Sequence, residues 1–112
     1  DPGCGGRNYQ LAALLLREMV DCELFLRNQV AFLSAGSDGE DGTAPMAGAS
    51  FDEQTLDAVA ADSSLRAALD QAILKNDCYT FFQSNGHQVL PPAISTNVCD
   101  VQVLLIAERA QD

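Results

Sequence analysis

Apolar positions along the chain fall into helical stripes and short unbroken runs, which together predict an α/β protein. Residues 30–33 form an unbroken apolar run inside a predicted strand over about residues 29–34, which ends at turn residues as buried strands do. Residues 101–107 form a nearly unbroken apolar run, which fits a strand buried on both faces. We expect a layered mixed or parallel sheet flanked by helices, with these two strands at its centre. Residues 9–25 instead repeat with helical spacing, and the predicted inner stripe consists of Leu11, Leu14, Leu15 and Cys22, widened by Ala12, Leu16 and Met19.

Capping residues predict three further helices in the second half of the chain. Asp52 precedes a helix that runs to about residue 60, and Asp62 precedes a second one. Asp77 precedes a third helix over residues 78–84, and Gly86 follows it at the position where glycine often ends a helix. Residues 87–90 then form a brief strand.

The loop over residues 34–42 follows the first predicted strand and is a candidate site. It contains three glycines and the carboxylates of Asp38, Glu40 and Asp41. Ligands of α/β proteins bind beyond the carboxyl ends of strands, and carboxylates are ligands that Mg²⁺ prefers. Asp38 and Asp41 are therefore candidate metal ligands. The alternative is a solvated acidic turn, a common use of such residues.

A glycine loop before the first predicted helix is a second candidate site. Gly5 and Gly6 precede Asn8, which we expect to be the N-cap residue. Free N–H groups and the helix dipole make such a terminus a natural anion cradle. Arg7 adds a planar guanidinium suited to carboxylate or phosphate. The alternative is a flexible entry to the helix, since the loop lacks the lysine of a phosphate-binding loop.

The net charge of the chain makes some binding partners unfavourable, and its cysteine content indicates the cellular compartment. The 112 residues carry a formal net charge of −10, so nucleic acid and anionic membranes are unfavourable partners. No apolar run approaches the roughly 20 residues of a membrane-spanning helix. The four cysteines form no C-x-x-C pair, which argues against zinc. We interpret Cys22, Cys78 and Cys99 as small hydrophobic residues in a protein of the reducing cytoplasm.

Four separated segments resemble, in order, elements of the MOFRL domain. Residues 5–8 (GGRN) resemble its G-G-R-N-Q-E element, and residues 34–42 (SAGSDGEDG) resemble S-A-G-T-D-G-x-D-G. Residues 76–82 (NDCYTFF) resemble N-D-S-Y-x-F-F, and residues 96–98 with Asp100 resemble T-N-V-x-D. The resemblance covers almost the whole chain, so residues 1–112 are interpreted as one MOFRL-like domain.

The resemblance implies a role in glycerate 2-kinases, also called hydroxypyruvate reductases, in which this domain is the C-terminal half. It implies an α/β fold and an active site between two domains, where ATP and Mg²⁺ bind in the complete kinase. Arg7 would engage substrate, and Asp38 and Asp41 would line the same cleft. The implied substrate- or anion-binding set is completed by Gly5, Gly6, Asn8, Thr96 and Asn97.

At three positions where the family has polar segments, this chain has a different sequence. These differences determine which function we expect. Residues 9–10 are Tyr-Gln where the family has Q-E, residues 43–45 are Thr-Ala-Pro where it has P-T-D, and residues 92–95 are Pro-Ala-Ile-Ser where it has G-P-T-G. The family's first strand and the kinase N-terminal domain are missing from this sequence. We expect a domain that is not catalytic alone and retains a small-anion or glycerate-like site.

Two alternatives remain open at this point. The chain could be one subunit of a split glycerate kinase, with the missing half as its partner. It could instead be a homodimeric interaction module without a ligand, in which Ile94 lies at or near the interface because that segment is more apolar than in the family.

Overall fold

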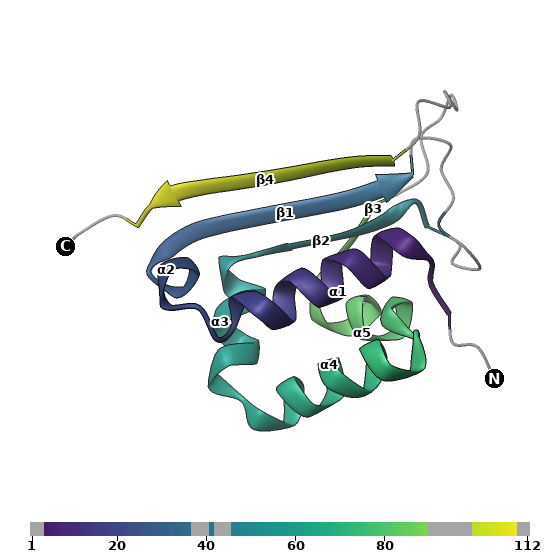
Figure 1. Ribbon diagram of the computed structural model, residues 1–112, viewed down its shortest axis with the longest axis horizontal. Coiled ribbons are helices and arrows are strands. Elements are labelled where there is room, and N and C mark those ends of the chain that lie inside the picture. The colour runs from purple at the N-terminus through teal and green to yellow at the C-terminus, as the bar shows by residue number, and fades with distance from the viewer. Residues whose placement is uncertain (1–3, 37–40, 42–45, 90–99, 110–112) are drawn as a thin grey trace.

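The structure is a computed structural model and describes residues 4–36, 41, 46–89 and 100–109. Helices and strands follow one another along the chain as shown in Figure 1. In chain order they are α1 (Arg7–Met19), α2 (Glu23–Leu26), β1 (Asn28–Gly36), β2 (Gly48–Asp52), α3 (Glu53–Ala61), α4 (Ser63–Lys75), α5 (Cys78–Asn85), β3 (His87–Val89) and β4 (Asp100–Glu108).

The described strands form one four-stranded sheet in the order β3-β2-β1-β4. The predicted α/β class, a sheet flanked by helices, is confirmed. The predicted mixed or parallel arrangement is wrong for these strands, because every pairing among them is antiparallel. Nearly unbroken apolar runs are typical of parallel strands that are buried on both faces, and β4 does not meet that condition because its side chains are exposed.

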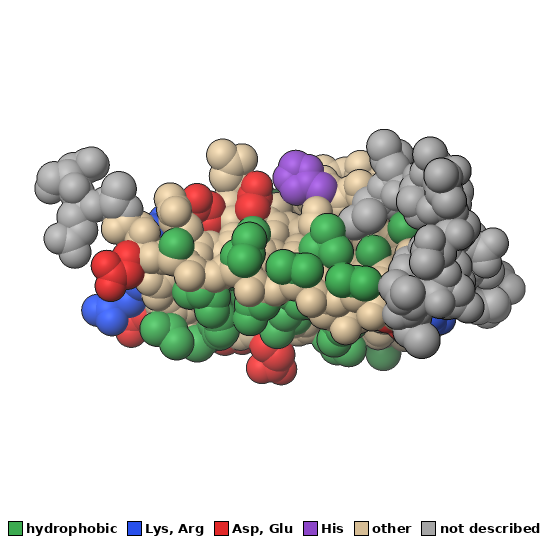
Figure 2. Space-filling view, turned by 90° about the horizontal axis from the view of Figure 1, so that it is seen from above, with side chains coloured by type: hydrophobic (Ala, Val, Ile, Leu, Met, Phe, Trp, Pro, Cys, Tyr) green, Lys and Arg blue, Asp and Glu red, His purple; other side chains and the backbone are tan. Residues whose placement is uncertain are grey.

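Strand β4 lies at the edge of the sheet rather than at its centre. Its apolar side chains alternate between the two faces, yet all of them are exposed to solvent: Val101 41%, Val103 42%, Leu104 44%, Leu105 63% and Ile106 50%. Figure 2 looks down on this edge and shows hydrophobic side chains gathered along it. The prediction of a central β4 is therefore corrected: an apolar run shows that a strand favours burial, but not which segment covers it.

Helix α1 lies across β1 and β2 on the face that the other helices also cover (Figure 1). Its buried stripe differs from the predicted one, since Leu11 and Leu14 are more than 40% exposed. The helix also ends at Met19 rather than near residue 25, because Cys22 adopts an extended conformation (φ −110°, ψ 110°) and begins α2. The residues that α1 buries are Asn8, Tyr9, Ala12, Ala13, Leu16 and Met19.

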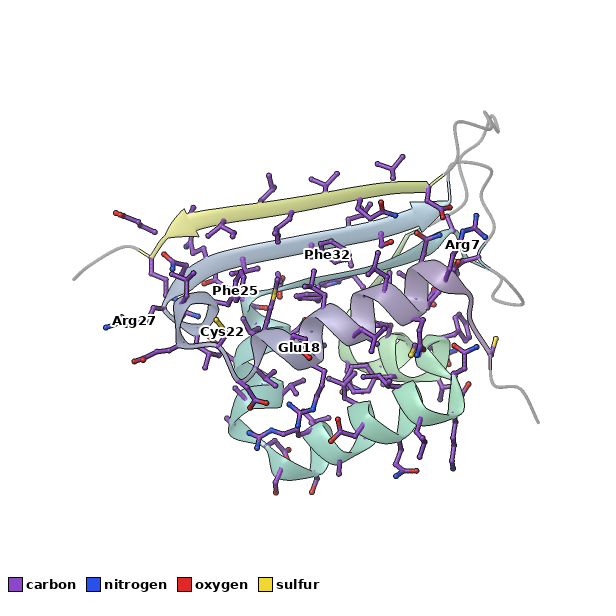
Figure 3. The ribbon with its side chains drawn as sticks, in the orientation of Figure 1. Arg7, Glu18, Cys22, Phe25, Arg27 and Phe32 are labelled. Carbon is purple, nitrogen blue, oxygen red and sulfur yellow. The ribbon has the colours of Figure 1, made fainter. Side chains whose placement is uncertain are left out.

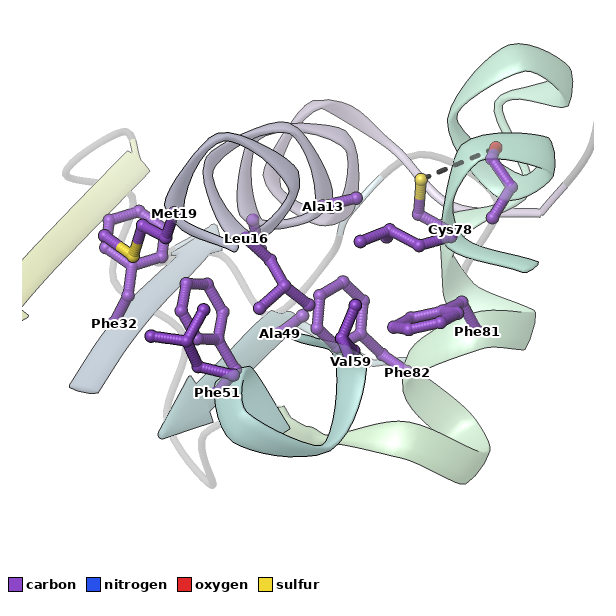
Figure 4. Packing of buried hydrophobic residues seen from close by; sticks show 14 of the residues in the cluster. Ala13, Leu16, Met19, Phe32, Ala49, Phe51, Val59, Cys78, Phe81 and Phe82 are labelled. Carbon is purple, nitrogen blue, oxygen red and sulfur yellow. Dashed lines mark hydrogen bonds between the residues drawn. The ribbon is translucent and has the colours of Figure 1, made fainter. Parts of the chain in front are cut away.

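The hydrophobic core lies between this helical layer and the covered face of β1 and β2 (Figure 4). Aromatic rings make up much of it: Phe82 lies 6.1 Å from the Tyr9 ring and 5.5 Å from the Phe81 ring, measured between centroids. Both arrangements are edge-to-face, the geometry that aromatic pairs favour. Phe32 of β1 and Phe51 of β2 are register partners on the same face, 5.7 Å apart.

The predicted starts of α3 and α4 are confirmed by their caps. The Asp52 carboxylate accepts the backbone N–H groups of Gln54 and Thr55, and the Asp62 carboxylate does the same at the start of α4. Gly86 ends α5 as expected, although its backbone is extended (φ 179°) rather than left-handed. Glycine is needed there for space, because an added Cβ would lie 2.6 Å from the Phe82 ring.

Gly48 provides a test of the pairing between β1 and β2. A Cβ at this position would lie 2.0 Å from the carbonyl oxygen of Ser34 and 2.6 Å from the Cα of Ala35, on the backbone of β1. We expect Gly48→Ala to lower the free energy of unfolding by at least about 2 kcal/mol, since backbone cannot move aside as a side chain can. Urea denaturation measures the change. Ser50→Ala, in the same strand, is the control, and an equal effect of both changes would contradict the pairing.

Candidate functional site

The carboxylate of Asp41 caps the N-terminus of α1. Its oxygens accept hydrogen bonds from the backbone N–H groups of Gly6 (3.2 Å), Asn8 (2.9 Å) and Tyr9 (2.7 Å). Asp41 is completely buried. The first turn of a helix has N–H groups without partners inside the helix, and its dipole favours a negative charge there. The chain's own carboxylate therefore occupies the backbone donors that were predicted to cradle an anion, and binding of an external anion stays a prediction.

This arrangement corrects the predicted role of Asn8. The N-cap residue is Gly6, which is extended (φ −131°, ψ −159°), and Asn8 lies inside the first turn. The side chain of Asn8 is 1% exposed and turns toward the sheet instead of capping its own helix. Gly5, just before the cap, has φ +132°, a backbone conformation that favours glycine.

The amide of Asn8 joins the two carboxylates of the site. Its Nδ2 donates to Oδ1 of Asp41 (3.1 Å) and to Oδ1 of Asp100 (3.2 Å). Its Oδ1 accepts from the Ser34 hydroxyl (2.6 Å) and from Nε2 of Gln102 (3.5 Å). Both donors and both acceptor positions of the amide are therefore used. We call these five residues the Asn8 network. Asn8 belongs to α1, Ser34 to β1, and Asp100 and Gln102 to β4, while Asp41 lies between β1 and β2 in the chain.

Arg7 extends the Asn8 network to the surface. Its Nε donates to Oδ2 of Asp100 and its Nη2 to Oδ1 at 2.8 Å, a bidentate ion pair. This hydrogen bonding from Arg7, followed by that from Asn8, holds the pKa of Asp100 below its usual range. The Arg7 side chain is 65% exposed. Figure 3 shows it where α1 begins, close to the end of β1 and the start of β4.

Three of the predicted site residues, Asp38, Thr96 and Asn97, lie outside the described residues, as does Ile94. Among the residues that are described, no group of three or more metal-ligating side chains comes together. Both oxygens of Asp41 are directed at α1. The metal-binding role of Asp38 and Asp41 therefore stays a prediction. Of the eight predicted binding residues, the structure brings together Gly5, Gly6, Arg7, Asn8 and Asp41.

Two buried titratable groups near the site serve the core rather than chemistry. Burial raises the pKa of the Tyr9 hydroxyl well above its usual value, and this hydroxyl donates to Oε1 of Gln88 at 2.8 Å. Burial, and secondarily Asp77, raises the pKa of the Cys78 thiol to about 12. That thiol donates to Oε1 of Gln10. At neutral pH both groups are protonated, so neither is an activated nucleophile.

Sequence reasoning did not single out Ser34, Asp100 and Gln102 as members of the site. Ser34 shares the covered face of β1 with Val30 and Phe32, and a hydroxyl on a core face requires a partner. Gln102 interrupts an apolar strand, and it is the register partner of Ser34. A polar residue at each of these two positions, in strands that are otherwise largely apolar, was the sequence signal that could have identified Ser34 and Gln102 as partners in the site.

This geometry defines the class of protein. It is a small α/β domain whose first helix is capped by a carboxylate and whose exposed arginine is held in one orientation by an ion pair. The sequence matches the MOFRL family over residues 1–100, and the chain belongs to this family. The resemblance to the MOFRL domain of glycerate kinases is thereby confirmed. No helix in the described part of the chain is long and apolar enough to cross a membrane.

Relatives and solved structures agree with this assignment. Glycerate kinase of Danio rerio is 38% identical over an alignment that covers 97% of this chain and 21% of that protein. Human glycerate kinase is 35% identical, with 96% of this chain and 20% of that protein covered. The chain thus spans about a fifth of the length of these curated relatives.

Two solved structures have a similar fold. A glycerate kinase from Thermotoga maritima superposes with a TM-score of 0.73 at 30% identity, covering 94% of this chain and 23% of that one. A protein from Pyrococcus horikoshii superposes with a TM-score of 0.74 at 21% identity, covering 97% and 23%. The second likeness concerns the fold alone.

The capping role of Asp41 can be tested with a matched pair of aspartates. We expect Asp41→Asn to lower the free energy of unfolding by about 2–4 kcal/mol, because the new amide directs donors at buried N–H groups. The same change at Asp62, which caps α4 at an exposed position, should cost less than about 0.5 kcal/mol. Chemical denaturation gives both values. Equal costs would show that Asp41 does not hold α1.

The pairing of Arg7 with Asp100 predicts a pH effect with a definite sign. Because the folded-state pKa of Asp100 is lowered, the pair stabilises the fold above the usual aspartate range of about 4, and this contribution is lost as the pH falls through the lowered pKa. We expect Arg7→Ala to raise the pKa of Asp100. An NMR titration of the Asp100 carboxyl carbon measures this change. Arg17→Ala, which removes an ion pair with Asp70, should leave that pKa unchanged.

Proposed function

We propose that this chain acts as the MOFRL domain of an enzyme of the glycerate kinase type, and that it presents Arg7 to a small anionic ligand. The observation that carries this proposal is the guanidinium of Arg7, which is exposed yet held in a fixed plane by two hydrogen bonds to Asp100. Planar, bidentate donors suit carboxylate and phosphate groups. The relatives named glycerate kinase support the same class of ligand.

The chain alone is proposed to lack kinase activity. Phosphoryl transfer requires nucleotide, metal and acceptor to be held in line, so the groups that hold them must converge on one cleft. This chain covers about a fifth of the length of its curated relatives. ATP and Mg²⁺ therefore belong to a complete two-domain enzyme, in which Asp38, Thr96 and Asn97 would complete the site.

The helix terminus itself is not the proposed receptor. Asp41 fills the backbone donors of the first turn, so an added anion would have to displace a buried carboxylate. Arg7 is the cationic group of the site that is largely exposed to solvent. The charge of Arg7 is balanced by Asp100, so the exposure and the fixed orientation of its guanidinium, rather than a net positive charge, are what would suit this spot to an anion.

A second candidate function, a homodimeric association module, is favoured by β4. This strand presents apolar side chains on both faces and a long edge of the sheet, features that proteins commonly cover. A second copy of the chain is the partner proposed for this function. A split kinase, with the other half on a separate chain, is the remaining alternative. Light scattering of the chain alone separates the homodimeric module from the split kinase, because only the homodimeric module gives the mass of a dimer.

A cytoplasmic location is also proposed. In the described part of the chain, Cys22 and Cys78 are free thiols, which fits a reducing compartment. The acidic surface makes nucleic acid and anionic membranes unfavourable partners.

Activity and binding measurements on the purified chain test the main proposal. We expect no ATP-dependent formation of phosphoglycerate, because the chain supplies only part of the cleft. We expect calorimetry to detect binding of phosphate or glycerate to the wild type and none to Arg7→Ala, with the fold retained by circular dichroism. Arg17→Ala, a matched change at another ion-paired arginine, should bind as the wild type does. Phosphoglycerate formation, or equal binding to the Arg7 variant, would refute the proposal.

A further inference from the structure

We propose that Ser34 and Gln102 are positioning residues for Arg7, acting through Asn8 and Asp100 without touching a ligand themselves. The inference rests on the proposed function for the identity of the ligand. The positioning itself can be measured without any ligand. Hydrogen bonds lead from the interior of the sheet to the exposed guanidinium in three steps.

The register of β1 and β4 provides the first step. Ser34 and Gln102 are directly opposite each other in this antiparallel pair, and Nε2 of Gln102 donates to the Ser34 hydroxyl at 3.3 Å. The Ser34 oxygen thus accepts from one neighbour while its proton is donated to Oδ1 of Asn8 at 2.6 Å. The strand pairing therefore fixes both the position of this hydroxyl and the direction of its donated proton.

The orientation of the Asn8 amide is the second step. Its Oδ1 faces the donors from Ser34 and Gln102, and its Nδ2 faces two carboxylates. A flipped amide would place its carbonyl oxygen against both carboxylates, which is electrostatically unfavourable. The hydroxyl of Ser34, which is completely buried, strengthens this choice of orientation.

Asp100 transmits the orientation to Arg7 in the third step. One oxygen, Oδ1, accepts from both Asn8 Nδ2 and Arg7 Nη2, while Oδ2 accepts from Arg7 Nε. A bidentate pair needs the carboxylate and the guanidinium in nearly one plane. Asn8 therefore restricts the rotation of the Asp100 carboxylate, and this carboxylate restricts the guanidinium of Arg7.

This chain of contacts is proposed to pre-organise Arg7 for binding. A side chain that is 65% exposed would otherwise sample many rotamers, and ordering it would reduce the affinity for a ligand. A network that only joined α1 to the sheet would stabilise the fold equally well with Arg7 disordered. The motion of the Arg7 side chain is therefore the readout that separates positioning from a purely structural role.

The experiment measures ¹⁵N relaxation of the Arg7 Nε–H group in the uniformly labelled chain. We expect this group to be ordered in the wild type and more mobile in Ser34→Ala and in Gln102→Ala. The Nε–H group of Arg17, held by Asp70 at 2.6 Å, is the internal control and should not change. Ser50→Ala, a serine change on β2 outside the Asn8 network, should leave Arg7 ordered.

Phosphate titration of the same samples by calorimetry provides the second readout. We expect Ser34→Ala and Gln102→Ala to weaken phosphate binding by roughly two- to tenfold, the effect of leaving one long side chain unordered before binding. Ser34→Thr retains the hydroxyl and should bind more tightly than Ser34→Ala. Gln102 is exposed, so its variant keeps the test available if loss of the buried Ser34 hydroxyl prevents folding.

Each outcome decides the inference. Mobile Arg7 together with weakened phosphate binding supports both the positioning role and the proposed function. Mobile Arg7 in a chain whose wild type binds no phosphate or glycerate supports positioning and refutes the proposed anion site. An Arg7 side chain that stays as ordered as in the wild type in both variants overturns the positioning role, whatever happens to stability or affinity.

Discussion

The contact between the Asp41 carboxylate and the first turn of α1 is the constraint on which the rest of the site depends. A buried carboxylate is costly unless hydrogen bonds compensate the loss of water. Here three backbone N–H groups and the Asn8 amide provide four hydrogen bonds. The helix needs an acceptor at its N-terminus and the loop needs a buried anchor, so one carboxylate satisfies both requirements.

This anchor determines where the other polar groups lie. With Asp41 placed against α1, Asn8 is held between two carboxylates, and its oxygen is left to the donors from β1 and β4. The helix is thereby connected to both strands by polar contacts as well as by core packing. Arg7 lies one residue before Asn8, and its partner Asp100 is the first residue of β4. The exposed cation thus stands at the end of a network that begins in the interior.

Local signals predicted the helical half of the chain well. Asp52 and Asp62 identified the starts of α3 and α4, because a cap involves residues two or three apart. The sheet was harder, since the direction of pairing and the exposure of β4 depend on segments far apart in the sequence. The helix α1 was also misplaced at both ends. Its first turn depends on Asp41, 33 residues away from Asn8, and it ends before Cys22, whose extended backbone precedes α2.

The candidate site could be predicted in part for the same reason. Gly6, Arg7 and Asp41 were identified from residue type and from family resemblance, but their partners were not. The Arg7–Asp100 contact spans 93 residues, and no spacing rule reaches that far. The prediction of an open anion cradle was incomplete because sequence patterns show which groups need a partner without showing that the chain already supplies one.

Hydrogen exchange of the Asn8 and Tyr9 backbone amides in the native protein tests the central claim most directly. Their protons are donated to a fully buried carboxylate, so exchange requires the loop to separate from α1. We expect protection close to that of Leu16, a buried residue further along the same helix. The amides of Ser64 and Leu65, which an exposed aspartate caps at the start of α4, should exchange much faster. Equally fast exchange of Asn8 and Tyr9 would contradict the account.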